Sequence, residues 1–227
     1  MYFSTSCEDS TFEYMSEIPI DCSKCGNQAC WSASPQDGPI FCPTKTCEDS
    51  VRAAIHLYQE DPETRNMAIA AGRTEGRSYM KWTRVEDTID FARNMGYKKL
   101  GIATCIGLMA EDRILQKILI AKGFEVVSIC CKCGSIPKEE IGLLDNEKAK
   151  PGTFEPMCNP VAQAKILEKA GTELNILLGL CVGHDALFTK YSGVPVTTLV
   201  AKDRITCHNP NAVLHGTSFY YKKLLSP

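Results

Sequence analysis

The stretch from Ile176 to Asp185 limits the possible folds more than any other part of this chain. It begins as a continuous apolar run and ends in Cys181, a glycine and a His-Asp pair that opens an apolar helical pattern. Such a run is typical of a strand buried on both faces, as in a parallel sheet covered by helices. A thiol at the end of that strand, beside a helix N-terminus, lies where open α/β sheets bind ligands and where a thiolate is stabilised.

Strand and helix patterns alternate from Lys99 onward, which favours right-handed crossovers and a parallel sheet. We therefore predict an α/β fold with a parallel sheet of about four strands and helices on both faces. The expected strands cover residues 99–104, 124–129, 173–180 and 194–200, and the expected helices between them cover 107–122, 161–170 and 185–191. Further helical patterns cover residues 47–58, 61–80 and 85–95, with a short helix expected after Asn209-Pro210.

An N-terminal Cys-rich loop module precedes this alternation. Residues 1–20 are expected to be an irregular lead-in, and residues 21–47 combine five cysteines with glycine and proline, which indicates a loop rather than regular structure. A loop with few apolar residues needs another source of stability, and a bound metal supplies on the order of 10 kcal/mol. We assign residues 1–60 to this metal-binding module with its first helix, and residues 61–227 to the α/β domain.

The predicted ligands of the module are Cys22, Cys25, Cys30 and Cys42, with Cys47 left open as a fifth candidate. A Cys-x2-Cys pair lets two thiolates hold one metal from a single turn. The second half of the motif lacks a matching pair, and the longer spacings fit iron–sulfur ligation as well as zinc. We favour an iron–sulfur cluster and keep zinc as the alternative; free reduced thiols are the non-functional interpretation.

Composition excludes several classes of protein. The 13 cysteines are an odd number in a chain of ordinary hydrophobic content, which favours metal ligation over a disulfide framework. A net charge of −2 gives no excess of positive charge that would indicate nucleic-acid binding. The acidic start does not resemble a secretory signal, and the longest apolar run is too short to cross a bilayer. We expect a cytoplasmic protein with no nucleic-acid or membrane partner.

A second group of cysteines falls at the ends of the predicted strands. Cys105, one of Cys130, Cys131 and Cys133, and Cys181 each follow a strand, and Cys158 precedes a helix start at Asn159-Pro160. All four places belong to one edge of a parallel sheet, so we expect them to converge on one site. Free cysteine also packs as a small hydrophobe, so burial in the core is the alternative for each of them.

Charged residues and a histidine accompany this edge. His184 and Asp185 are candidates for proton transfer, and Lys202 and Arg204 for holding an anion. Simpler roles are a helix N-terminus for Asp185 and local pairing of Asp203 with Arg204. His208 is either part of the site or a turn residue, and we interpret His56 and His215 as structural.

These motifs resemble a prokaryotic family of uncharacterised proteins described as predicted metal-binding (domain of unknown function 1847). The resemblance covers roughly Cys22 to the C-terminus and implies metal binding without a reaction. Its paired cysteine and lysine match Cys131-Lys132, which makes Cys131 our first choice among the three neighbouring cysteines. The motifs are Ala103–Leu108, Cys131-Lys132, Cys158–Pro160, Gly179–Asp185, Lys202–Arg204 and His208–Pro210.

In layout alone, the thiols at strand ends are also similar to those of thiouracil desulfidases. In those enzymes three cysteines hold a four-iron cluster whose fourth iron takes sulfur from the substrate. The resemblance therefore implies a 4Fe-4S cluster held by Cys105, Cys131, Cys158 and Cys181, with an open iron or one free thiol, acting on a sulfur-containing or small anionic substrate. The alternative is a non-catalytic carrier or sensor of electrons, sulfur or metal, with a redox partner protein, or a zinc-binding protein.

Overall fold

The structure is a computed structural model, and it describes residues 20–227. The lead-in expected at residues 1–20 lies outside the described residues, apart from Ile20. Contacts divide the chain into one unit that ends at Ile69 and a second unit from Ala70 to Pro227. The sequence had placed this boundary after residue 60; the structural division falls inside helix α3 (Pro62–Ser78).

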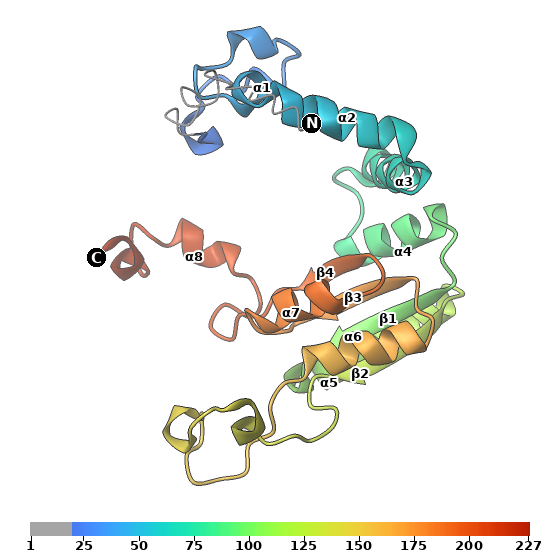
Figure 1. The fold of residues 1–227 in the computed structure, drawn as a ribbon, viewed down its shortest axis with the longest axis vertical. Coiled ribbons are helices and arrows are strands. Elements are labelled where there is room, and N and C mark those ends of the chain that lie inside the picture. Colours follow the sequence, from blue (N-terminus) through green and yellow to red (C-terminus); the bar gives the residue numbers. More distant parts are fainter. Residues whose placement is uncertain (1–19) are drawn as a thin grey trace, which may run out of the picture. The chain divides into compact units, whose positions relative to one another are not determined.

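The second unit is built on a parallel sheet, which confirms the predicted α/β fold (Figure 1). The four strands are β1 (Lys99–Thr104), β2 (Glu125–Cys130), β3 (Leu174–Leu178) and β4 (Val196–Val200). Their order across the sheet is β2-β1-β3-β4, and every pair is parallel. All strands therefore end at the same edge, because parallel strands share one direction.

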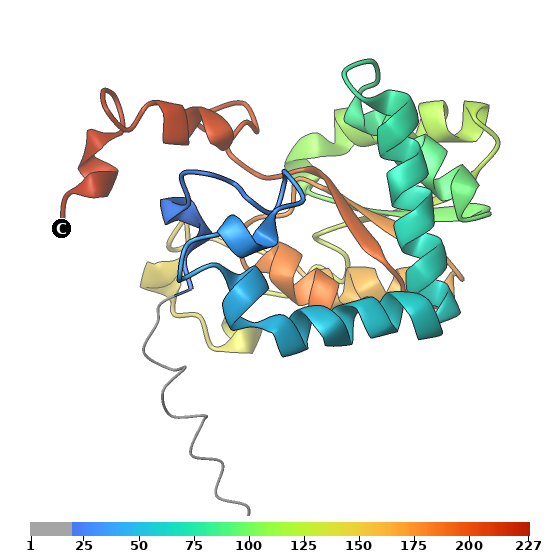
Figure 2. The same ribbon diagram turned by 90° about the horizontal axis from the view of Figure 1, so that it is seen from above.

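Helices cover both faces of the sheet (Figures 1 and 2). On one face, α4 (Arg84–Asn94) and α5 (Met109–Ala121) pack on alternate strand residues such as Leu100, Ile102 and Ile176. On the other face, α6 (Pro160–Lys169) and α7 (His184–Tyr191) pack on the residues between them, such as Ala103 and Leu177. Each fully buried leucine or phenylalanine here contributes roughly 1.5–3 kcal/mol, so apolar burial is a main source of stability for the sheet.

Element boundaries differ from the sequence prediction in ways that matter for the cysteines. Strand β2 includes Cys130, so the first residue after it is Cys131. Strand β3 stops at Leu178, because Gly179 adopts a φ of +72° and turns the chain away. A Cβ at Gly179 would lie 2.1 Å from Leu108 Cδ1, so only glycine fits beside the segment that follows β1.

Two predicted helix starts have different outcomes. Asn159 caps α6 as expected, because its Oδ1 accepts a hydrogen bond from the Ala162 amide at 3.0 Å. The last helix, α8 (Asn211–His215), forms after Asn209-Pro210 as predicted, but Asn209 does not cap it. The capping position belongs to Pro210, which already has helical φ and ψ, so Asn209 lies one residue too early.

The first unit contains three α-helical segments: α1 (Pro43–Thr46), α2 (Glu48–Glu60) and the beginning of α3. The prediction of pure loop for residues 21–47 was wrong in part, since 3₁₀ turns form at Cys22–Lys24 and Pro35–Asp37 and α1 begins at Pro43. Among residues 20–47, only Ala29 and Cys42 are both apolar and buried. This segment therefore has almost no hydrophobic core of its own.

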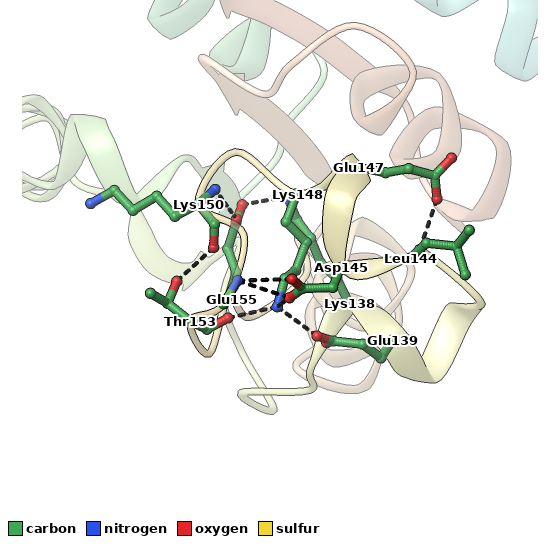
Figure 3. Close-up of polar contacts among 10 residues, drawn as sticks. Lys138, Glu139, Leu144, Asp145, Glu147, Lys148, Lys150, Thr153 and Glu155 are labelled. Carbon is green, nitrogen blue, oxygen red and sulfur yellow. Dashed lines mark hydrogen bonds and ion pairs between the residues drawn. The ribbon is translucent and has the colours of Figure 1, made fainter.

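Between β2 and α6 the chain forms a lobe at residues 134–157 (Figure 3). Its centre is the ammonium group of Lys148, whose side chain is 3% exposed and pairs with Glu139 at 2.6 Å and Asp145 at 2.7 Å. The same ammonium donates to the Thr153 carbonyl at 2.6 Å, and Lys138 pairs with Glu155 near the lobe's base. The lobe is thus organised by ion pairs, where the sheet is organised by apolar burial.

Within residues 20–227, no helix is both long and apolar enough to cross a membrane.

Candidate functional site

Three of the predicted cysteines meet where β1, β2 and α6 come together. Cys105 directly follows β1, Cys131 directly follows β2, and Cys158 precedes the cap of α6. Backbone bonds hold these segments in register: the Cys131 amide donates to the Thr104 carbonyl at 2.8 Å, and the Asn159 amide donates to the Cys131 carbonyl at 2.7 Å. The predicted convergence at one sheet edge therefore rests on the pairing of the chain itself.

The thiol of Cys131 lies between the other two sulfurs. It makes side-chain hydrogen bonds with both Cys105 and Cys158, and it is 1% exposed. The Ile106 amide also donates to Cys131 Sγ at 3.3 Å. The three sulfurs thus form a short chain, with the buried thiol in the middle.

The hydrogen bonds among these three thiols shift their pKa values in opposite directions. The hydrogen bond from Cys131 lowers the pKa of Cys105 to about 5, helped by the Gly107 amide and the charge of Lys202. The same donor lowers the pKa of Cys158 to about 5, helped by Lys132 and His184. The pKa of Cys131 is raised, because holding its proton stabilises both neighbours. One S–H serves one neighbour at a time, so the full shift applies to one outer thiol at once.

The predicted cations lie against the sulfurs. Arg204 Nη2 donates to Cys181 Sγ at 3.3 Å, and this contact raises the pKa of Arg204. Lys202 lies close enough to Cys105 to lower its pKa. Cys181 is therefore joined to the site through Arg204, whose charge is also felt by Cys105 and Cys158. Both candidate anion-binding residues act here as counter-charges to thiolates.

The turn that carries these cations is fixed by Asp203 and His208. Asp203 Oδ1 accepts from the amides of Ile205 and Thr206 at 2.9 and 3.1 Å. His208 Nδ1 accepts from the Asp203 amide at 3.1 Å. His208 thus has the turn role that was its simpler alternative. Asp203 holds the same turn, and the local pairing expected as its simpler role is not found, since no Asp203–Arg204 ion pair forms among the described residues.

The two predicted proton carriers differ. His184 Nδ1 is buried and has no hydrogen-bond partner within residues 20–227, and its charge helps lower the pKa of Cys158. Asp185 lies in the first turn of α7, where its Oδ1 accepts from the Ala186 amide at 2.8 Å. His184 therefore has a free nitrogen close to the thiols, whereas Asp185 serves the helix start.

Gln163 was not among the site residues predicted from the sequence. It is fully buried in α6 and its Nε2 donates to the Thr104 carbonyl at 3.1 Å and to the Ile129 carbonyl at 2.6 Å. These carbonyls end the two strands that deliver Cys105 and Cys131. Its Oε1 is buried without a partner in the described part of the chain. The only feature of the sequence that could have indicated this role is a glutamine on the apolar face of a predicted helix.

The remaining cysteines of the β2 turn are Cys130 and Cys133, both half-buried. The Cys133 amide donates to the Cys130 carbonyl at 3.1 Å, which closes a tight turn. Burial raises the pKa of Cys133, and the nearby Cys130 adds to the shift. Within residues 20–227, neither has a hydrogen bond to Cys105 or Cys158, whereas Cys131 bonds to both.

The first unit has its own cysteine site. A cavity of about 390 Å³ is lined by the four predicted ligands Cys22, Cys25, Cys30 and Cys42, but not by Cys47. The Thr44 hydroxyl and amide lower the pKa of Cys42. The four cysteines thus surround one space, formed by the turns on either side of Pro35–Asp37.

Every described cysteine is free of disulfides. Within residues 20–227, no group of three or more His, Cys, Asp or Glu side chains is arranged as a ready ligand set for a single metal ion. In the central site the sulfurs form a hydrogen-bonded chain, and in the first unit they line a cavity.

Comparison with known proteins identifies the family. The model of the family "Protein of unknown function (DUF1847)" matches residues 42–199. The chain belongs to this family. It is also 42% identical over 206 residues to "Uncharacterized protein MJ0455" of Methanocaldococcus jannaschii, a match that covers 91% of this chain and 98% of that protein. The family match includes all four cysteines of the central site but only Cys42 and Cys47 of the five cysteines at residues 22–47.

Proposed function

We propose that this protein binds an iron–sulfur cluster through Cys105, Cys131, Cys158 and Cys181, and uses that site on a sulfur-containing or small anionic substrate. The observation that carries the proposal is the meeting of three thiols from three separate elements, with Cys181 joined to them through Arg204. Core cysteines need no such partners, because a small hydrophobe packs well without them.

The donor set fits a cluster in its chemistry. Thiolates are the usual ligands of iron–sulfur clusters, and they must lose their protons to bind. Cys105 and Cys158 already favour the charged form, and Cys131 keeps the proton that metal binding would release. Lys202 and Arg204 supply positive charge beside a thiolate-rich centre. A cluster bound there would supply an iron that acts as a Lewis acid toward the substrate.

The chain's own residues have distinct parts in this proposal. His184 holds or releases a proton at its free Nδ1, close to Cys158. Lys202 and Arg204 balance the thiolates and turn to a substrate anion when the thiolates are neutralised by metal. Asp185 supports the α7 start, so we expect it to affect the position of His184 more than proton transfer itself.

The experiment is anaerobic purification followed by iron, zinc and acid-labile sulfide analysis and electron paramagnetic resonance. Wild type should contain iron and sulfide. Cys181→Ala should lose or change the visible absorption and resonance of the central site, while the control Cys207→Ala, which removes an exposed cysteine, should keep both. Full iron and sulfide with an unchanged spectrum in Cys181→Ala would contradict the proposal.

For the first unit we propose a separate, structural metal site held by Cys22, Cys25, Cys30 and Cys42. The cavity that these cysteines line has room for more than one ion, which favours an iron–sulfur cluster; zinc, with sulfurs about 2.3 Å from one centre, is the alternative. Because the two sites lie in different units, iron that remains after Cys105, Cys131, Cys158 and Cys181 are all replaced by Ala would belong to the first unit.

A second candidate function is a non-catalytic carrier or sensor of electrons, sulfur or metal. The contact of Cys131 with two other sulfurs favours it, since adjacent thiols can pass a proton or sulfur between them. The His184→Gln variant separates the two. A catalyst would keep its cluster and lose turnover of a thiolated or anionic substrate, while a carrier would keep both its cluster and its redox behaviour.

A further inference from the structure

We propose that Cys130 and Cys133 form a second, redox-active dithiol that exchanges with a disulfide-bearing partner or small disulfide. This pair lies outside the four-cysteine site, and the inference does not depend on the proposed cluster. Its basis is the turn Cys130-Cys131-Lys132-Cys133, which puts two cysteines in Cys-x-x-Cys spacing at the end of β2.

The backbone brings the pair within reach of a disulfide. The Cys133 amide donates to the Cys130 carbonyl at 3.1 Å, so positions 130 and 133 are the first and last residues of a β-turn. Such residues have Cα atoms less than about 7 Å apart. Disulfides join Cα atoms at about 4.4–6.8 Å, so the bridge needs little movement of the chain.

The cysteines of this turn differ in burial and in their contacts. Cys131 is buried and points to Cys105 and Cys158, while Cys130 and Cys133 are both half-buried and keep access to solvent. Gly134, with a φ of +91°, and Ser135, with a φ of +50°, reverse the chain directly afterwards. The buried thiol is thus withdrawn from exchange, and its two neighbours are left available.

The exchange has a defined order. Cys133 Sγ is engaged by the Asn159 carbonyl at 3.9 Å, so Cys130 is the thiol that attacks first. Cys130 Sγ bonds to one sulfur of the partner disulfide, and the other sulfur leaves as a thiol that takes up the proton lost by Cys130. Cys133 Sγ then attacks Cys130 Sγ and releases the second thiol. The pair loses two electrons and two protons, and the partner disulfide gains both.

The test equilibrates the full-length protein in buffers of reduced and oxidised glutathione, followed by acid quenching, alkylation and peptide mass spectrometry. Trypsin cuts after Lys132, so a Cys130–Cys133 bridge joins two otherwise separate peptides. We expect this linked species to appear as a two-electron titration in wild type, in Cys131→Ser and in the control Cys207→Ser. In Cys130→Ser it should vanish, leaving Cys133 free or as a mixed disulfide with glutathione.

Two outcomes would overturn the inference. One is a wild-type protein in which Cys133 stays free or bound to glutathione at every ratio. The other is loss of the linked peptides in Cys131→Ser, which would make Cys131 the true partner. The wild-type protein keeps the two proposals apart: a bridge without a cluster would remove only the proposed function, and a cluster without a bridge would remove only this inference.

Discussion

The two cysteine sites of this protein are assembled in opposite ways. In the first unit, four cysteines within residues 22–42 line one cavity, and the chain around them buries almost no apolar surface. In the second unit, cysteines from residues 105 to 181 are brought together by a parallel sheet whose core is buried on both faces. If the proposed metal sites exist, the first segment would depend on its ligand for stability, whereas the sheet has an apolar core of its own.

This difference predicts opposite responses to cysteine removal, and the effect should be the largest expected here. Cys22→Ser with Cys25→Ser should unfold residues 20–47 and lower the stability of that segment by several kcal/mol, since structural metal sites supply on the order of 10 kcal/mol. Cys105→Ser with Cys158→Ser should leave the sheet intact. Hydrogen exchange measured peptide by peptide resolves the two units.

The comparison would fail if the exchange patterns were reversed or equal. Protection of residues 20–47 unchanged in the first double variant would mean that this segment folds without its thiols. Loss of protection in β1 and β3 in the second would mean that the sheet depends on the central site. Cys207→Ser serves as the matched control for removing a cysteine from the second unit.

Gln163 allows the support of the central site to be tested apart from its ligands. Gln163→Leu keeps the side-chain volume but removes the hydrogen bonds to the Thr104 and Ile129 carbonyls. We expect a loss of about 1–3 kcal/mol in the free energy of unfolding, because a buried carbonyl is left unpaired. Denaturant titration measures it, with Lys165→Gln on the exposed side of α6 as the control.

A positioning role for Gln163 has a second readout. If Gln163 aligns the strand ends that carry Cys105 and Cys131, its loss should broaden or shift the spectrum of the cluster while the four cysteines remain. Stability lost with an unchanged spectrum would make Gln163 a core residue only. An unchanged stability would mean that the two hydrogen bonds are replaced by water.

The sequence predicted the central fold because its signals are strong and local. The apolar run of β3 and the alternation of elements gave the parallel sheet, and the rule that parallel strands end at one edge brought Cys105, Cys131 and Cys158 together. The sequence could not show that Cys131 lies between the other two, or that Arg204 contacts Cys181, since these depend on side-chain directions. Gln163 was missed because its partners are backbone carbonyls more than thirty residues away.

The sequence predicted which helices and strands form better than it predicted where each of them begins and ends. Strand β3 is shorter than expected because Gly179 must approach Leu108, a contact between segments far apart in sequence. Asn209 carried the same Asn-Pro signal as Asn159 but caps nothing, because the chain enters α8 with Pro210 already helical. In the first unit, prolines that suggested loop instead begin short helical turns.

The lobe offers a smaller test, because it adds a third kind of assembly to the comparison. Lys148→Met should remove the ammonium that holds Glu139, Asp145 and the Thr153 carbonyl together, and the freed carboxylates would turn to solvent. We expect faster hydrogen exchange in residues 138–155, with no change in β1 or β3. The control is Lys150→Met, because the Lys150 ammonium makes no ion pair within residues 20–227. Equal exchange in both variants would show that Lys148 does not organise the lobe.

The smallest expected effect is the pH dependence of the central thiols in metal-free protein. Cys131 lowers the pKa of Cys105 or of Cys158 to about 5, according to which of them accepts its proton. Ionisation of that thiol stabilises the fold fully above the ordinary thiol pKa near 9, and this contribution is lost as the pH falls toward 5. Cys131 has a raised pKa, so its contribution is present below pH 9 and is lost only at higher pH. Stability from this site should therefore rise with pH between about 5 and 9.

Removing the shared proton tests the cause of these shifts. Cys131→Ala should move the pKa of both outer thiols upward, because each loses its largest source of stabilisation. Alkylation rates of Cys105 and Cys158, followed by peptide mass spectrometry from pH 4 to 10, give the pKa values directly. Since one S–H serves one neighbour at a time, wild type should show one thiol titrating near pH 5 and the other higher. Unchanged profiles in Cys131→Ala would assign the shifts to Lys202, Lys132 and His184 instead, and would make the central thiol a packing residue.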